Sequence, residues 1–370
     1  MQLLNATGMP ASLCMGMRPD GRELLVVVVK GTFNMPLQHE PVSRSEQQKP
    51  LLTADQFTGE PGLSAPLYET DFAPFKPRCD VLLNGSAYAP GGRPATRVEV
   101  TLRLANLFKS FAVTGNRYWE SGNIAISPGY PGLFESMPIS YDRAFGGVDD
   151  RHENTQKHAA WPGNPVGVGF HYHLSREWVD GSPMPNTEEL RRPVSMPDGS
   201  YAPMALGPVG RGWEPRRRLA GTYDDAWLEE HFPFLPPDFD EAYYQSAPTD
   251  QQINHLHGGE RVFLENLTPQ GQTSFDLPLI DVPVVFFYRN GESVRQTALI
   301  DTVVLEPDEG VFTLTWRTHV PLKRNIFEIE EVLAGRKTKA WWRARELGKV
   351  YYPSLAHLAD AKRASSVEEE

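Results

Sequence analysis

The sequence predicts a mainly β protein whose antiparallel sheets pack like a sandwich, with a long irregular middle region and a short helical C-terminus. Runs rich in β-branched residues occur in both halves of the 370-residue chain, and such runs are typical of strands. The chain also holds 31 Gly and 33 Pro, so it must turn often. Sustained helical spacing of apolar residues begins only after residue 324.

An N-terminal β region is predicted over residues 1–114. The segment 23–35 (ELLVVVVKGTFNM) follows a turn signal, and its uninterrupted valines indicate a strand buried on both faces. Further strands are predicted at 81–88, 96–104 and 107–114. The turn APGGRP at 89–94 is expected to join the first two of these as a hairpin.

Regular periodicity is lost in the middle region, residues 115–250, where Pro, Gly and aromatic residues dominate. Short helical patches are predicted at 224–230 and 238–245, with Asp224 and Asp238 as their N-caps. A segment of this length is expected to be packed by its own aromatic side chains. The alternative, in which these aromatic side chains form a sugar-binding or peptide-binding surface, stays open.

A C-terminal β region is predicted over residues 251–322. Its strands are expected at 261–266, 282–289, 293–305 and 311–319, and the Asn-Gly pair within 289–292 predicts a hairpin. The following segment, 323–364, is predicted to be helical. Two short helices over 325–335 and 337–349 would be separated by a cap at Gly335, and a disordered tail over 365–370 is expected.

Charge and targeting signals limit the partners and the location. Lys plus Arg number 36 and Asp plus Glu 47, which gives a net charge of −11. This charge opposes nucleic-acid backbones and anionic lipid surfaces. Because no signal peptide is recognisable and the longest apolar run, 24–29, is too short for a membrane span, we expect a cytoplasmic protein without membrane insertion. Two cysteines, Cys14 and Cys79, are expected to be free thiols.

The sequence lacks several common catalytic motifs. The chain has no phosphate-binding glycine loop, no nucleophile elbow and no zinc-protease helix, so we predict neither an enzyme nor a cofactor. His171 and His173 lie two residues apart, as do His255 and His257, and on a strand each pair would point to one face. Without a third ligand, ordinary surface or hydrogen-bonded roles are favoured over a metal site.

Carboxylates offer one alternative function, because a glycoside hydrolase needs two of them beside the scissile bond. Candidates are Asp142, Asp149, Asp150, Asp224, Asp225, Asp238, Asp240 and Asp250. Because the chain is rich in Gly and Pro, we favour roles for these aspartates in turns and helix caps. Asp142 is expected to pair with Arg143 and tie down its loop, with Gly146 and Gly147 supplying positive φ.

Six residues are predicted to bind a partner or to organise loops: Asp142, Arg143, Asp250, Gln251, Trp341 and Trp342. The two tryptophans lie in the basic stretch 336–345. This stretch is either a partner-binding face or, as we favour, a solvated helix face whose tryptophans pack on a sheet.

Seven segments also follow one another in a specific order: DFAPFKPRCDVLLNGSAYAPGG (71–92), KSFAVTGNRYW (109–119), MPISYDRAFGG (137–147), NPVGVGF (164–170), AGTYDDAW (220–227), LPPDFD (235–240) and APTDQ (247–251). Over about residues 1–320 the chain resembles a bacterial family once labelled only as a domain of unknown function. Members are encoded beside type VI secretion spike proteins and toxic effectors, and they are regarded as effector adaptors or chaperones.

The resemblance implies binding rather than catalysis, and it carries over no active-site residue. The implied partners are a secreted effector protein and a spike-tip protein, and an exposed strand edge is one means by which such a fold could hold a client. A hydrolase directed at the cell wall and a structural subunit of the spike are the alternatives.

Overall fold

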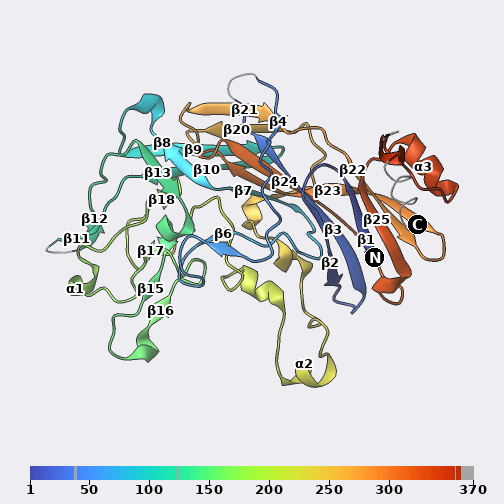
Figure 1. The fold of residues 1–370 in the computed structure, drawn as a ribbon. Helices are drawn as coiled ribbons and strands as arrows, with labels where there is room; N and C mark the ends of the chain where they lie inside the picture. Colours follow the sequence, from blue (N-terminus) through green and yellow to red (C-terminus); the bar gives the residue numbers. More distant parts are fainter. Residues whose placement is uncertain (37–39, 123–124, 355, 360–370) are drawn as a thin grey trace, which may run out of the picture.

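A computed structural model describes residues 1–36, 40–122, 125–354 and 356–359 (Figure 1). The mainly β fold is confirmed, and the structure has two principal sheets, several two-stranded ones and a few short helices. The expected tail, 365–370, lies outside the described residues. Within them, no helix has both the length and the apolar character needed to cross a membrane.

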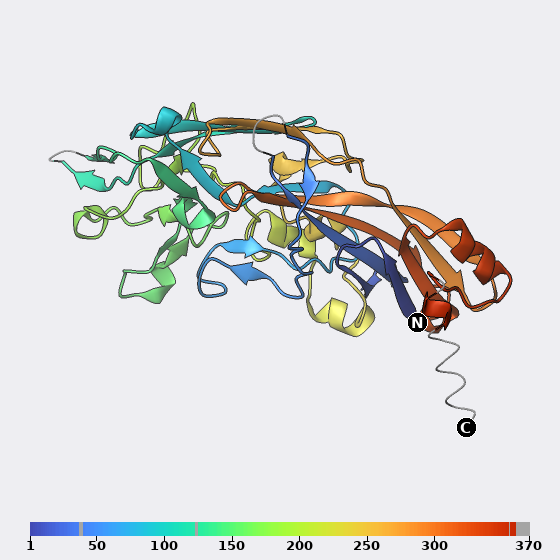
Figure 2. The same ribbon diagram turned by 45° about the horizontal axis from the view of Figure 1, so that its top comes forward.

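The largest sheet has ten strands and curls into a half-barrel (Figure 2). Its main path runs in the order β1 (Gln2–Ala6), β25 (Ile329–Gly335), β22 (Val282–Tyr288), β23 (Ser293–Glu306), β24 (Val311–Pro321), β3 (Glu23–Asn34) and β2 (Ala11–Met17). Off this path, β4 (Ser43–Arg44) pairs with β3, β7 (Cys79–Leu83) with β23, and β19 (Gln252–Ile253) with β7. The end strands β1 and β2 are joined by only residues 7–10, so the two edges of the sheet meet at this link.

Strand β3 confirms the first strand prediction and its burial on both faces. Every residue from Leu24 to Phe33 is buried. Leu25, Val27 and Val29 face the main core, whereas Leu24, Val26 and Val28 form a smaller cluster on the other face. An uninterrupted apolar run therefore marks the centre of this sheet.

The second sheet has the order β18 (Thr187–Glu188), β10 (Leu107–Thr114), β9 (Arg97–Leu104), β20 (Arg261–Glu265) and β21 (Gln272–Asp276). Phe275 of β21 packs on Phe312 of β24, and their ring centroids lie 5.1 Å apart. Residues of both sheets share one hydrophobic core. Both sheets combine strands from the two β regions of the chain, since β3 pairs with β24 and β9 with β20.

The predicted hairpin between 81–88 and 96–104 is wrong. The chain leaves the large sheet at Asn84, whose N–H donates to the Leu305 carbonyl, and β8 (Gly85–Tyr88) then pairs with β13 (Ser136–Ile139). Strand β9 pairs instead with β10 and β20. The turn signal at 89–94 correctly marks a change of direction, but such a signal does not specify which strand becomes the partner. The hairpin at 289–292 is confirmed between β22 and β23.

The predicted helix over 325–335 is also wrong. A short 3₁₀ turn, Ile326–Glu328, leads into strand β25, which lies between β1 and β22. Gly335 ends this strand rather than capping a helix. Apolar residues at 329, 332 and 333 fit helical spacing, but pairing on both sides overrides that local preference. The second predicted helix is confirmed as α3 (Lys339–Glu346), with Thr338 as its N-cap.

The middle region is built from short strand pairs around a second core. The pairs are β11 (Trp119–Ser121) with β12 (Ile126–Pro128), β14 (Phe145–Gly146) with β17 (Val168–Gly169), and β15 (Val148–Asp149) with β16 (Ala159–Ala160). A similar short pair, β5 (Gln56–Phe57) with β6 (Pro66–Tyr68), comes from the N-terminal region. Buried residues of the second core are Trp119, Phe145, Phe170, Val179, Met184, Val194 and Tyr201. The prediction that most middle-region aromatics serve as core is confirmed for these rings and for buried Trp213.

Helices in the middle region are short. α1 (Arg176–Val179) is one turn long, and α2 (Asp225–Glu230) confirms the patch predicted there, with Asp224 as its N-cap. The patch predicted at 238–245 is a single 3₁₀ turn, Glu241–Tyr244, capped by Asp240 and not by Asp238. The other 3₁₀ turns are Pro90–Gly92, Tyr141–Arg143, Thr155–Lys157, Arg216–Ala220 and Thr249–Gln251.

Candidate functional site

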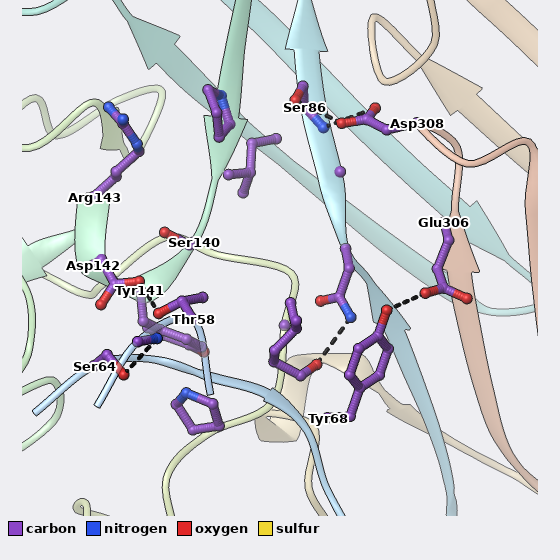
Figure 3. Close-up of a pocket in the computed structure, with 18 of the residues that line it drawn as sticks. Thr58, Ser64, Tyr68, Ser86, Ser140, Tyr141, Asp142, Arg143, Glu306 and Asp308 are labelled. Carbon is purple, nitrogen blue, oxygen red and sulfur yellow. Dashed lines mark hydrogen bonds between the residues drawn. The ribbon is translucent and has the colours of Figure 1, made fainter. Parts of the chain in front are cut away.

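A cleft of about 710 Å³ opens beside β6 and contains two of the predicted residues, Asp142 and Arg143. Its walls come from segments far apart in the sequence: the β5–β6 hairpin, the turn after β13, and the end of β23 (Figure 3). In the close-up, Asp142 and Thr58 lie on one wall, and Tyr68 and Glu306 on the other.

Asp142 and Arg143 do not pair with each other, contrary to the prediction. Asp142 accepts hydrogen bonds from the Thr58 hydroxyl at 2.7 Å and from the Ala65 N–H at 2.8 Å. Arg143 donates to the Asn186 side chain at 3.1 Å. The two neighbours on the 3₁₀ turn therefore hold different segments, and their role as loop-organising residues is supported by geometry.

The opposite wall carries a buried carboxylate, Glu306. It accepts a hydrogen bond from the Tyr68 hydroxyl and lies 2.7 Å from Lys49 Nζ, which also contacts Glu309 at 2.8 Å. Burial together with Glu306 raises the pKa of Tyr68 well above its usual range. Although burial opposes the charged form of Lys49, its hydrogen bonds to Glu306 and Glu309 raise its pKa. Lys49 is therefore charged at neutral pH.

Asp308 lines the top of the same cleft. Its carboxylate accepts from the Ser86 hydroxyl at 2.7 Å and from the Tyr88 hydroxyl at 2.9 Å. Burial and Asp308 raise the pKa of Tyr88 to about 12. Each carboxylate of the cleft is thus held by groups of this chain, an arrangement that stabilises the walls.

Asp250 and Gln251 lie beside a second, largely apolar cleft of about 260 Å³. Lys109 Nζ contacts Asp250 at 2.9 Å and donates to the Gln251 side-chain oxygen at 2.8 Å. Gln251, fully buried, donates in turn to the carbonyls of Val81 and Leu206. Burial lowers the pKa of Lys109 despite the Asp250 carboxylate. Both predicted residues therefore organise the junction between β10, β7 and the middle region.

A network of buried charged residues was not predicted from the sequence. Asp80, fully buried, contacts Lys76 at 2.7 Å and accepts from Gln245 at 2.6 Å and from the Ser246 N–H at 2.8 Å. Lys30 and Asp71 form a second buried pair at 2.9 Å. The signal was present in DFAPFKPRCD (71–80), where charged residues interrupt a proline-containing apolar run. Such charges must be paired when they are buried.

Arg317 connects this network to the sheet. It pairs with Asp301 and donates to the carbonyls of Asp71 and Ala73. Charged hydrogen bonds therefore fix segment 71–80 on the outer face of the half-barrel. This segment begins the first of the seven ordered motifs.

The histidine pairs do not converge on a common site. His171 is hydrogen-bonded to Ser182, and His255 to the Lys76 carbonyl. Asp149 accepts from the backbone N–H groups of Tyr172 and His173. In the part of the chain that the structure describes, no group of three or more His, Cys, Asp or Glu side chains is arranged to hold a metal ion.

The tryptophans of α3 are half-buried. Trp342 packs against Phe287 of β22 and lies under the Arg295 guanidinium, 4.6 Å from its ring centroid. Trp341 packs edge-on against Trp342. The interpretation in which the tryptophans pack on the sheet is confirmed for Trp342.

A further exposed apolar surface lies outside the six predicted site residues. Residues 221–240, here called the α2 arm, project from the body of the molecule and carry α2 at their tip (Figure 1). Exposed apolar side chains on the arm are Tyr223, Leu228, Phe232 and Phe234. Their clustering around Trp227 becomes visible only once the arm is folded.

Comparison with known proteins gives one match. Residues 20–317 match the family model described as an uncharacterized protein conserved in bacteria, DUF2169. No curated protein and no solved structure shows a significant match to the chain. Since the matched residues span well over half of the sequence, the chain belongs to the bacterial DUF2169 family.

Proposed function

We propose that this protein is an adaptor or chaperone that binds a toxic effector of a type VI secretion system, or the effector's spike-binding domain, and presents it to the spike-tip protein. The observation that carries the proposal is the exposed aromatic surface of the α2 arm. The resemblance of the ordered motifs to effector adaptors supports the choice of partner.

The α2 arm is suited to binding because its apolar groups are both exposed and held in place. Phe232 is 63% exposed and Leu228 57%. Trp227, on the same helix as Leu228, donates its indole N–H to the Phe234 carbonyl at 2.9 Å, and the centroids of the Trp227 and Tyr223 rings lie 4.7 Å apart. A surface ordered in advance loses little conformational entropy on binding, and aromatic side chains are common energetic centres of interfaces.

The charges of the arm indicate the character of the partner surface. Asp225, Glu229 and Glu230 are exposed on the same short helix as Leu228. Acidic groups around an apolar centre favour a partner with an apolar patch bordered by Lys or Arg. We therefore expect the effector's contact surface to be apolar with a basic rim.

Co-expression with the effector encoded beside the gene tests the proposal. We expect the effector's soluble yield to rise and the two proteins to co-elute at a fixed ratio. The double variant Leu228→Ser/Phe232→Ser should lose this co-elution, because it removes the exposed apolar contacts. Leu279→Ser is the matched control, since Leu279 is 82% exposed and lies outside the arm. Failure of the wild-type protein to bind the effector would contradict the proposal.

Different experimental results would support the two alternative functions, a hydrolase and a structural subunit of the spike. If Asp142→Asn or Asp250→Asn abolished killing while effector binding and stability stayed intact, the hydrolase hypothesis would replace the adaptor. A stable oligomer that forms part of the spike without any effector would instead indicate a structural subunit.

A further inference from the structure

Strand β2 forms one edge of the half-barrel. Two hydrogen bonds show which of its residues direct their backbone groups toward β3. Lys30 N–H donates to the Pro10 carbonyl at 2.9 Å, and Arg18 N–H to the Arg22 carbonyl at 3.0 Å. In the antiparallel register of β2 and β3, these bonds place the even-numbered residues of β2 in hydrogen-bonded pairs. The backbone N–H and C=O groups of Ala11, Leu13, Met15 and Met17 therefore point away from β3.

These outward groups have no strand partner within the described residues. Strand β2 pairs only with β3, and β1, although joined to β2 by a short link, pairs only with β25. No backbone hydrogen bond between described residues reaches the outer side of β2. Unpaired main-chain groups along an edge strand are a template for another strand.

The sequence of this edge lacks the features that usually protect one. No Lys, Arg, Asp or Glu occurs in residues 1–17, and Pro10 precedes the strand rather than interrupting it. One edge strand of the second sheet, β21, differs, because its Asp276 forms an exposed ion pair with Arg261. Charged residues and prolines normally discourage pairing at edges, so β2 is open to pairing, and β1 at the opposite edge of the sheet shares this uncharged sequence.

We infer that β2 accepts an extended segment of the effector as an additional strand of the half-barrel. This inference rests on the proposed function. Ala11 and Leu13 pack against the main core, and Met15, on the same side, is 44% exposed. The arriving segment is therefore uncharged and carries an apolar side chain at alternate positions, so that it covers Met15 while its backbone pairs with β2.

The α2 arm lies at one end of this edge. Phe234 at its base contacts the turn between β2 and β3, where a Cβ on Gly21 would lie 3.0 Å from the phenyl ring. Arg18, directly after β2, also lies 3.9 Å from Glu241 just beyond the arm. The apolar arm and the open strand edge are thus adjacent, and one effector can contact both.

Two variants of Met15 test the inference. Met15→Pro removes an outward N–H without breaking the ladder to β3, and Pro is tolerated at edge positions whose N–H faces solvent. Met15→Lys keeps the backbone and adds the charge that protects natural edges. Met15→Val is the matched control for Met15→Pro, because it changes the side chain and keeps the backbone N–H. Leu279→Lys is the matched control for Met15→Lys, because it adds the same charge outside β2.

The probe is a set of overlapping, fluorescein-labelled fifteen-residue peptides that tile the neighbouring effector. We expect one uncharged peptide to bind the wild-type protein and both controls, with affinity reduced at least about tenfold in Met15→Pro and Met15→Lys. If both Met15 variants bind peptides and intact effector as the wild type does, while Leu228→Ser/Phe232→Ser does not, the inference is wrong and the proposed function stands. If the wild-type protein binds no effector at all, the proposed function itself fails.

Residue-resolved amide hydrogen exchange tests the edge without any ligand. In the free protein, the amides of Leu13 and Met15 should exchange much faster than those of Ser12 and Cys14, which bond to β3. Slow exchange at Leu13 and Met15 would show that the edge is already covered and would overturn the inference.

Discussion

At the scale of single residues, Asn164 and Gly146 determine the conformation of the loop that carries Asp142 and Arg143. Asn164 is fully buried, and its side-chain amide donates to the carbonyls of Tyr141 and Phe145. Gly146 has a φ of +155°, and a Cβ there would lie 2.1 Å from the Asn164 carbonyl oxygen. The close approach of these two backbones therefore requires glycine.

We predict that Gly146→Ala lowers the free energy of unfolding by at least about 2 kcal/mol, because the new methyl group forces the two backbones apart. Urea denaturation measures the change. Gly212→Ala is the control, since a Cβ at Gly212 meets no atom within 4 Å. Equal stability of the two variants would show that the close approach is not required.

His171 predicts a dependence of stability on pH. Ser182 donates its hydroxyl to the Val179 carbonyl at 2.6 Å, so its oxygen accepts a hydrogen bond from the His171 Nε2–H. Burial, and then the charge of Arg151, lower the pKa of His171, although Asp149 opposes this. As the pH falls below the ordinary histidine value of about 6.5, the unfolded chain binds a proton that the folded chain resists, and stability is lost.

We therefore expect His171→Gln to lose less stability than the wild type between pH 7.5 and 5.5. The amide of glutamine can still donate to Ser182 but does not titrate. His319, whose pKa burial also lowers, contributes a remaining dependence of the same sign in both proteins. Melting temperatures across this range measure the effect, and identical pH dependences of the two proteins would contradict it.

At the scale of elements, the buried pair Lys76–Asp80 anchors segment 71–80 to the sheet. We predict that Asp80→Ala costs about 3 to 5 kcal/mol, because it leaves a buried ammonium group without its partner. The double variant Lys76→Met/Asp80→Ala should recover part of this loss. Breaking the exposed pair Arg261–Asp276 should cost less than about 1 kcal/mol. Calorimetry measures all three, and a double variant less stable than Asp80→Ala would contradict the account.

Elements whose determinants are local could be predicted from the sequence. The valine run of β3, the Asn-Gly hairpin at 290–291 and the cap of α2 each depend on neighbouring residues. Strand β25 could not be predicted, because its identity depends on pairing with β1 and β22 from distant parts of the chain.

The same limit applies to the candidate site. The sequence singled out Asp142, but its partners Thr58 and Ala65 lie 84 and 77 residues away. Neighbours such as Asp142 and Arg143 are easily read as a pair, whereas a 3₁₀ turn directs them to different segments. Exposure is likewise a property of the folded chain, so the α2 arm could be recognised as a surface only from the structure.

At the scale of the whole molecule, a well-packed β body carries two features open to a partner, the α2 arm and the outer edge of β2. The carboxylates of the large cleft are engaged by groups of the chain itself. A rigid body with an adjacent apolar arm and open strand edge suits a protein that holds a client segment and later releases it. This arrangement agrees with the proposed adaptor role.

Export of individual effectors from cells that lack the gene tests the proposed role most directly. We expect export of the neighbouring effector to stop while the secretion machine still assembles and exports its other effectors. Wild-type protein should restore export, and Leu228→Ser/Phe232→Ser should not. Loss of all effectors together, or normal export of the neighbouring effector, would contradict the adaptor role.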